Sequence, residues 1–200
     1  MRQYNSSERT SRISLTHIMR NIAVGIFMAI SAIACRNNKP DSIDKAEAAN
    51  KKVVSVSADD LRFVVQAASG GMMEVELGRM AREQSSSQAV KDFGQTMIDD
   101  HSAANGELRN MAATKGITLP QKPGEEHQEM INKLAAKKGN DFDRAYIDMM
   151  VTDHEEDIDA YVNELKTGND MKIKTWVEQK LPTLRHHQEM AEQLQKQQLK

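Results

Sequence analysis

The chain has 200 residues, and its 27 Lys and Arg against 29 Asp and Glu leave a formal net charge of −2. This balance argues against a dedicated nucleic-acid binder, which concentrates positive charge on one face. A single cysteine excludes an intrachain disulfide framework and any cysteine-based zinc or iron–sulfur cluster, because each needs several thiolates. Aromatic residues make up only 4%, whereas there are 13 methionines, a composition typical of helices packed on helices.

The first feature in chain order is an apolar run at residues 22–34, which is followed by Cys35. A membrane helix needs about 20 apolar residues, so the run has instead the length of the apolar region of a signal peptide. Its last residues, Ala-Ile-Ala, fit the small-residue rule at a cleavage site, and the same bond precedes the cysteine as in a lipoprotein box. We therefore predict a signal peptide over residues 1–34, with Met19 as an alternative start, and lipidation of Cys35.

These features predict a lipoprotein of the bacterial cell envelope, either periplasmic or on the outer membrane. Its expected partner is the membrane, through the lipid anchor, and no protein partner or oligomer is identified. Simple secretion as a soluble or periplasmic protein is the alternative. Residues 35–57 are polar and lack helical apolar spacing, so we interpret them as the lipidated cysteine and a flexible tether.

From residue 58 onward, apolar residues recur every three or four positions, the pattern of amphipathic helices. Four long helices are predicted, at about 58–84, 87–115, 140–167 and 170–198. Ser57 and Asp60 form a capping-box pattern before the first helix, and Gly116 and Gly168 are stop signals. The connection between the second and third helices contains a short helix near 124–137.

Two helical hairpins joined by a long crossover are typical of bundles in which the second and third helices run parallel, as in ferritin-like folds. We therefore predict an all-α domain over residues 58–200. Its fold is expected to be a ferritin-like four-helix bundle with a short extra helix in the crossover between helices 2 and 3.

Three histidines lie on helix seams that are otherwise apolar. A buried neutral imidazole costs roughly 1–3 kcal/mol unless its nitrogens are hydrogen-bonded, so each needs a partner. At a rise of about 1.5 Å per residue, these histidines and two glutamates fall within roughly 10 Å of one another along the helix axes. The pattern predicts a buried metal centre of Glu74, Glu76, His101, His154 and His187.

Further side chains near the histidines are expected as outer partners or as alternative ligands: Asp100, Asp153, Met97, Met150 and Met190. A thioether next to an imidazole suits copper(I), whereas imidazole and carboxylate ligands suit zinc, so copper or zinc is the expected transition metal. The Glu-x-x-His pattern of di-iron proteins is absent from the sequence, so di-iron is disfavoured.

Other features of the sequence are interpreted as ordinary structure. His127 and His186 are expected on the surface, and the acidic stretch 153–159 is expected to be a solvated face. Gly70 and Gly71 lie within the first long helix and cost about 2 kcal/mol relative to alanine. We therefore expect a neighbouring helix or side chain to approach closely there.

Several stretches carry a resemblance to a known family: 63–68, 70–78, 97–101, 142–146, 153–154 and 181–187. In these stretches the chain resembles the bacterial exported, ferritin-like proteins catalogued as domain of unknown function 4142, over about residues 58–195. The resemblance implies a four-helix ferritin-like bundle and export, but the family carries no established reaction.

The function predicted from the sequence is a non-catalytic envelope lipoprotein that binds a metal ion or a partner through a buried His/Glu centre. One alternative is a metal-dependent oxidoreductase or a metal store built on the same centre. The other is a purely structural or interaction bundle in which the histidines are hydrogen-bonded to their neighbours.

Overall fold

The computed structural model describes residues 39–198. The predicted signal peptide, the alternative start at Met19 and Cys35 lie outside the described residues. Within residues 39–198 the regular structure is entirely helical, with no strand. No helix of this range combines the length and the hydropathy that a membrane crossing requires.

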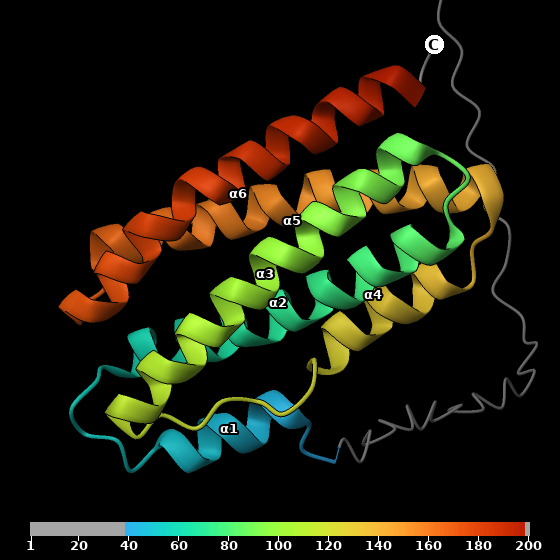
Figure 1. Ribbon diagram of the computed structural model, residues 1–200. Helices are drawn as coiled ribbons and strands as arrows, with labels where there is room; N and C mark the ends of the chain where they lie inside the picture. The colour runs from blue at the N-terminus through green and yellow to red at the C-terminus, as the bar shows by residue number, and fades with distance from the viewer. Residues whose placement is uncertain (1–38, 199–200) are drawn as a thin grey trace, which may run out of the picture. The chain divides into compact units, whose positions relative to one another are not determined.

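Six helices follow one another, and four of them are long (Figure 1). Their bounds are α1 (Ser42–Asn50), α2 (Ala58–Gln84), α3 (Gln88–Lys115), α4 (Glu125–Ala135), α5 (Gly139–Thr167) and α6 (Met171–Gln198). The predicted ranges of the four long helices agree with these bounds to within one residue at each end. The short helix α4 lies inside the range predicted for the crossover.

Local capping signals explain where these helices begin and end. Ser57 Oγ accepts the N–H of Asp60 at 3.1 Å, and Ser87 Oγ accepts the N–H of Val90 at 3.5 Å. Helix α3 ends at Gly116, whose φ of 69° is left-handed and costs a residue without Cβ little. The boundaries therefore follow from a few side chains that the sequence analysis could recognise.

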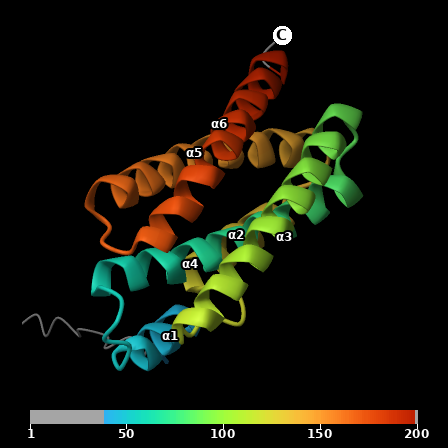
Figure 2. The same cartoon turned by 60° about the vertical axis from the view of Figure 1, so that its left-hand side comes forward.

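Polar contacts at the two ends of the long helices establish their relative directions. At one end, the carboxylate of Asp60 at the start of α2 accepts the N–H of Asp170, between α5 and α6, at 2.9 Å. At the other end, Ser86 between α2 and α3 donates to Asp143 near the start of α5 at 3.4 Å. Helix α2 therefore runs antiparallel to α5, whereas α3 runs parallel to α5 (Figures 1 and 2). Each of α2 and α6 contacts both α3 and α5.

Helix α1 corrects part of the prediction for residues 35–57. Residues 42–50 of the expected flexible tether form a helix, which begins with a reciprocal capping box between Asp41 and Asp44. This helix contacts α2. A tether interpretation is therefore wrong for this segment.

Polar side chains of α1 bind backbone groups of the crossover and help to hold the helix in place. Asn50 donates to the carbonyl of Thr118 at 2.9 Å and accepts the N–H of the same residue at 2.7 Å. Ser42 Oγ donates to the carbonyl of Lys122 at 2.8 Å. Because these contacts need no apolar periodicity, the sequence pattern gave no sign of a packed helix here.

Close helix packing occurs where glycines face one another. A Cβ atom placed on Gly78 of α2 would lie 2.6 Å from the carbonyl oxygen of Gly94 of α3, so only glycine fits there. The close approach expected at Gly70 and Gly71 is present at Gly71, where a Cβ atom would collide with the Asn105 side chain of α3. At Gly70 the nearest atoms would be at ordinary contact distance.

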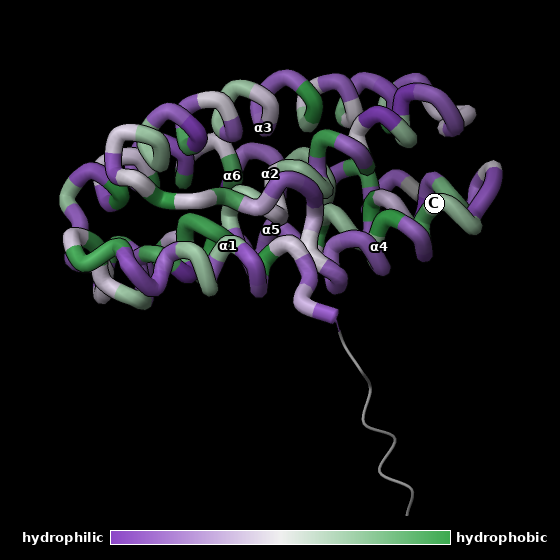
Figure 3. The backbone as a smooth tube through the Cα atoms, turned by 90° about the horizontal axis from the view of Figure 1, so that it is seen from below, coloured by the Kyte–Doolittle hydropathy of each residue, from purple (hydrophilic) through white to green (hydrophobic). Residues whose placement is uncertain are grey.

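The buried apolar side chains form two separate clusters. Along each helix, hydrophobic residues are interspersed with hydrophilic ones (Figure 3). We call the two clusters cluster A, which includes Met73, Leu77, Phe93, Met97, Tyr146 and Met150, and cluster B, which includes Leu61, Val64, Leu108, Tyr161, Trp176 and Leu184. On every long helix, the residues of cluster A and those of cluster B are separated by a short stretch of sequence. The polar groups described next lie in or close to these four stretches.

Candidate metal centre

The space between cluster A and cluster B is occupied by one polar side chain from each long helix. These are Glu74 of α2, His101 of α3, His154 of α5 and His187 of α6, and none is more than 5% exposed. His101, His154 and His187 each lie in the stretch that separates the two clusters on their helices, whereas Glu74 directly follows Met73 of cluster A. The helices therefore bring to one level three histidines that are 33 or more residues apart in sequence.

Direct contacts join the four side chains. His101 Nδ1 lies 2.7 Å from Glu74 Oε2, and His154 Nε2 lies 3.5 Å from Glu74 Oε1. His154 Nε2 also lies 3.3 Å from His187 Nδ1. The three imidazole rings have centroids 5.2 to 5.7 Å apart. The ring nitrogens of the three histidines lie within 4.8 Å of one another when one is taken from each.

The other ring nitrogens of His154 and His187 have partners outside this group. His154 Nδ1 lies 3.1 Å from the carbonyl oxygen of Met150, and His187 Nε2 lies 2.8 Å from Asp100 Oδ2. A carbonyl and a carboxylate can only accept, so each of these nitrogens carries the proton. In the neutral rings, His154 Nε2 and His187 Nδ1 are then both lone-pair atoms, and they face each other.

Burial keeps these two rings neutral. It lowers the pKa of His154 to about 4 and also lowers the pKa of His187. Neutral imidazoles are the form that binds a metal ion. Both rings are therefore ready to act as ligands near neutral pH.

His101 and Glu74 form a buried ion pair. Burial alone would lower the pKa of His101, but the Glu74 carboxylate outweighs it and raises that pKa. Burial alone would likewise raise the pKa of Glu74, but the three imidazoles outweigh it and lower that pKa to about 2. Glu74 Oε1 and His101 Nε2 are buried without a hydrogen-bond partner. Glu74 Oε1 is thus available as a ligand atom, and His101 Nε2 becomes one when the imidazolium releases its proton to a binding metal ion.

Two further carboxyl groups of α5 approach the centre. The ligand atoms of Asp153, Glu74 and His154 lie within 4.8 Å of one another, and Asp153 Oδ2 is buried without a partner. Burial and the Glu74 charge raise the pKa of Asp153 well above its usual range. Burial and the same charge raise the pKa of Asp157 to about 8. The expectation that the stretch 153–159 is a solvated face is therefore wrong for these two residues.

The sequence pattern does not identify Asp157 as a residue near the centre, because its neighbours in the chain are exposed acidic residues. The signal that could have identified it is its position, three residues after His154 and four after Asp153, which places all three on one face of α5. Asp153, by contrast, was expected as an outer partner or ligand, and it lies at the centre.

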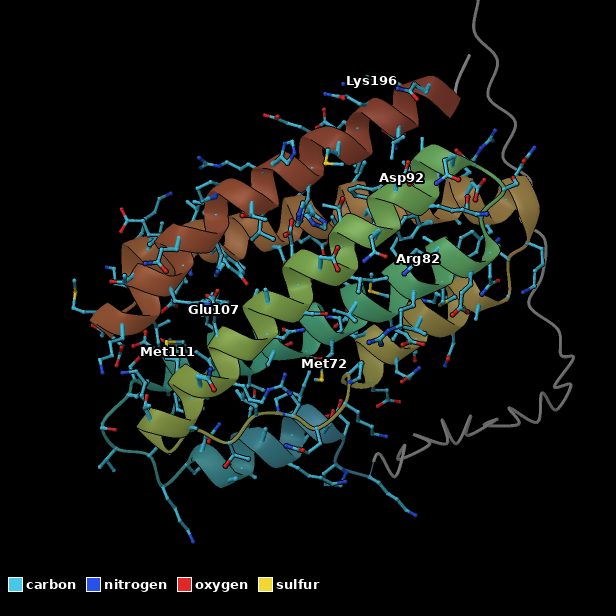
Figure 4. All side chains as sticks on the ribbon, in the orientation of Figure 1. Met72, Arg82, Asp92, Glu107, Met111 and Lys196 are labelled. Atoms are coloured by element: carbon cyan, nitrogen blue, oxygen red, sulfur yellow. The ribbon has the colours of Figure 1, made fainter. Side chains whose placement is uncertain are left out.

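Glu76 does not join the site and corrects the predicted ligand set. Its side chain is exposed on α2 and forms an ion pair with Arg79 at 3.3 Å. Two residues along a helix turn the side chain by about 200°, so Glu74 and Glu76 cannot both face the centre. Met72, labelled on α2 in Figure 4, is half-buried and lines a surface groove with Asn105 and Arg109.

The other methionines belong to the apolar packing. Met97 and Met150 are fully buried members of cluster A, and Met190 packs against the same cluster. The backbone carbonyl of Met150, and not a thioether, contacts a histidine of the centre. The donors of this site are therefore imidazole nitrogens and carboxylate oxygens.

The two histidines expected on the surface differ in their exposure to solvent. His186 is exposed, as predicted. His127 of α4 is half-buried, because its Nδ1 lies 2.6 Å from the Ser69 hydroxyl of α2, and burial lowers its pKa. The expectation that His127 is exposed is therefore wrong, and this residue belongs to the contact between α4 and α2.

Comparisons with known proteins agree with the helical fold. The model of the family described as "Domain of unknown function (DUF4142)" matches residues 45–194. No curated protein matches the sequence. A solved structure, titled "Crystal structure of DUF305 fragment from Deinococcus radiodurans", is similar to this chain with a TM-score of 0.62 at 14% identity. The match covers 71% of this chain and 98% of that one, and at this identity it shows a shared fold alone.

Proposed function

The chain belongs to the DUF4142 family, whose description assigns no function, and we propose that it binds a divalent transition-metal ion through its buried His/Glu centre. The ligands are one nitrogen from each of His101, His154 and His187, together with the Glu74 carboxylate. Each of the four long helices supplies one of them.

The facing lone pairs of His154 Nε2 and His187 Nδ1, 3.3 Å apart, are the observation that carries this proposal. Two acceptors in a closed, apolar surrounding repel each other, and Glu74 Oε1 adds a third acceptor 3.5 Å from His154. A cation between them removes the repulsion. The contacts of Met150 and Asp100 with the outer nitrogens match the outer hydrogen bonds that orient metal-binding histidines in other proteins.

The donor set favours zinc or copper(II). Imidazole nitrogens suit both ions, and carboxylate oxygens are common additional ligands of zinc. The packing of Met97 and Met150 in cluster A gives no support to a copper(I) site with thioether ligands. The proposed role is storage, transfer or structural use of the ion without catalysis. An oxidoreductase on the same centre is the alternative.

We also propose that the fold is a ferritin-like four-helix bundle. The parallel course of α3 and α5 supports this assignment, as does the crossover that carries α4 between them.

The cellular place of the protein is proposed from the sequence alone. The apolar run 22–34 and Cys35 support export and a lipid anchor in the cell envelope. Replacing Cys35 by Ser should release the protein from membranes or leave it uncleaved. An intact mass that shows an unmodified Cys35 would refute the lipid anchor.

Metal binding is tested by melting metal-free protein with zinc, copper(II), iron(II) and manganese(II) in turn. A bound ion stabilises the fold by mass action, by about 2.7 kcal/mol at a hundredfold excess over its dissociation constant. We expect a stabilising shift with zinc or copper, which is lost in the double variant His101→Ala/His154→Ala. The variant His187→Gln, a smaller change, should also lose it.

The matched control is His186→Ala, because this histidine precedes His187 but is exposed. It should keep the full stabilising shift. If no ion shifts the melting of folded, metal-free protein, the histidines form a structural hydrogen-bonded network and the proposed function is wrong. Turnover of peroxide or oxidation of the metal by the loaded protein would favour the enzyme alternative.

A further inference from the structure

More carboxylate oxygen is buried at the centre than one ion held by three histidines requires. Glu74 Oε1 and Asp153 Oδ2 come from facing helices, α2 and α5, and both are buried without a hydrogen-bond partner. Glu74 is 1% exposed and Asp153 is 9% exposed. Neither oxygen can therefore be satisfied by bulk water.

The positions of the three groups show where such oxygens converge. One ligand atom from each of Glu74, Asp153 and His154 lies within 4.8 Å of the other two. Asp153 Oδ2 lies 4.0 Å from His154 Nδ1, the nitrogen on the opposite side of the ring from His187. The Asp153 carboxyl thus adds an oxygen beside the His154 nitrogen that does not face His187.

Two carboxyl groups that face each other in an apolar core need either a shared proton or a cation between them. The Glu74 carboxylate lies between two positions, because its Oε1 lies 3.5 Å from His154 Nε2 and one of its oxygens lies within 4.8 Å of an Asp153 oxygen. Two-metal sites hold their cations about 3.5–4 Å apart, a separation that a carboxylate between the two ions can span.

We propose that Glu74 and Asp153 hold a second divalent cation beside the ion bound by the three histidines. This inference rests on the proposed metal-binding function and adds a second position of different chemistry. The first position is rich in imidazole nitrogen, whereas the second is rich in carboxylate oxygen. Oxygen ligands suit harder ions such as manganese(II) or magnesium, so the two positions select different metals.

Counting the bound ions tests the proposal. Metal-free protein is titrated with zinc, dialysed, and then titrated with manganese(II), and the bound metals are measured by elemental analysis and by electron paramagnetic resonance of free manganese. We expect one zinc and one manganese per chain. The variant Asp153→Asn should keep the zinc, with an affinity changed less than about threefold, and should lose the manganese.

The matched control is Asp159→Asn, an exposed residue of α5, which should keep both ions. One zinc and no manganese in the unaltered protein would overturn the second position and leave the proposed function intact. Two bound ions in Asp153→Asn would also overturn it, because the second ion would then bind elsewhere. No bound ion in the unaltered protein would overturn both proposals.

Discussion

Nε2 of His154 lies 3.3 Å from Nδ1 of His187, and neither atom carries a proton when the two rings are neutral. The partners of the opposite nitrogens decide this, since the carbonyl of Met150 and the carboxylate of Asp100 each require a donor. The outer contacts therefore determine which atoms the centre presents to a cation. Changing an outer contact should change metal affinity without touching a ligand.

Asp100→Asn is the direct test of that relationship. The variant replaces a charged acceptor by a neutral amide, so His187 Nδ1 becomes a weaker ligand. We expect a 10- to 100-fold loss of metal affinity, as is typical for such outer hydrogen bonds. The fold should persist, because the side chain of Asp100 is 45% exposed. Titration calorimetry with zinc measures the loss.

The control for this test is Asp99→Asn, an exposed carboxylate that accepts a hydrogen bond from the Gln95 amide at 2.8 Å. It should bind zinc as the unaltered protein does. A second readout is the nitrogen chemical shift of His187, which reports its tautomer. Equal zinc affinities in the two variants would show that Asp100 does not orient His187.

The raised pKa of Glu164 predicts that the stability of the fold depends on pH, independently of the metal centre. Burial, together with the nearby Asp60 carboxylate, raises the pKa of Glu164 from 4.5 to about 7. The folded chain therefore binds more protons than the unfolded chain between these pH values. The stability from this group is fully present below pH 4.5 and is lost as the pH rises through about 7.

Glu164→Gln should remove that loss, since glutamine resembles the protonated carboxyl group. Between pH 4.5 and 8 the unaltered protein should lose about 1–2 kcal/mol that the variant keeps, since solvent screening reduces the full effect of the shift. Urea unfolding at several pH values measures the difference. Glu178→Gln, at an exposed position of α6, should follow the unaltered protein. Parallel pH profiles for all three proteins would contradict the prediction.

Asn50→Ala tests whether α1 belongs to the folded domain. The variant leaves both backbone groups of Thr118 without their side-chain partner, and we expect a loss of about 1–3 kcal/mol in the free energy of unfolding. Lys51→Ala changes an exposed neighbour and should be neutral. Equal stability of the two variants would indicate that α1 is not firmly docked.

Gly78→Ala tests the close approach of α2 and α3. The added Cβ atom would lie 2.6 Å from the backbone carbonyl of Gly94, which cannot rotate away, so we expect a destabilisation of about 1–3 kcal/mol. Gly106→Ala is the matched control, because no atom lies within 4 Å of its Cβ position. It should stabilise α3 by up to about 1 kcal/mol. Thermal melts that rank the two variants in the opposite order would refute the close packing.

The choice between Glu74 and Glu76 shows why the sequence could not define the ligand set. Helix α2 contacts α1, α3, α4 and α5, so it is apolar on several faces and its periodicity does not select one. A buried glutamate and an exposed one two residues later look alike in such a pattern. The sequence does not distinguish Asp157 for a related reason, because its neighbours in the chain are exposed acidic residues.

The sequence by itself determined the extents of the four long helices and the three histidines of the centre. Both depend on local properties: caps, glycine stops, and a polar residue on an apolar seam. Tertiary structure alone decided that α1 is a docked helix and that Glu74, and not Glu76, faces the centre. It also decided which nitrogens of His154 and His187 face inward. Those features depend on contacts between groups distant in the chain, such as Asn50 with Thr118, and the local sequence pattern does not indicate such contacts.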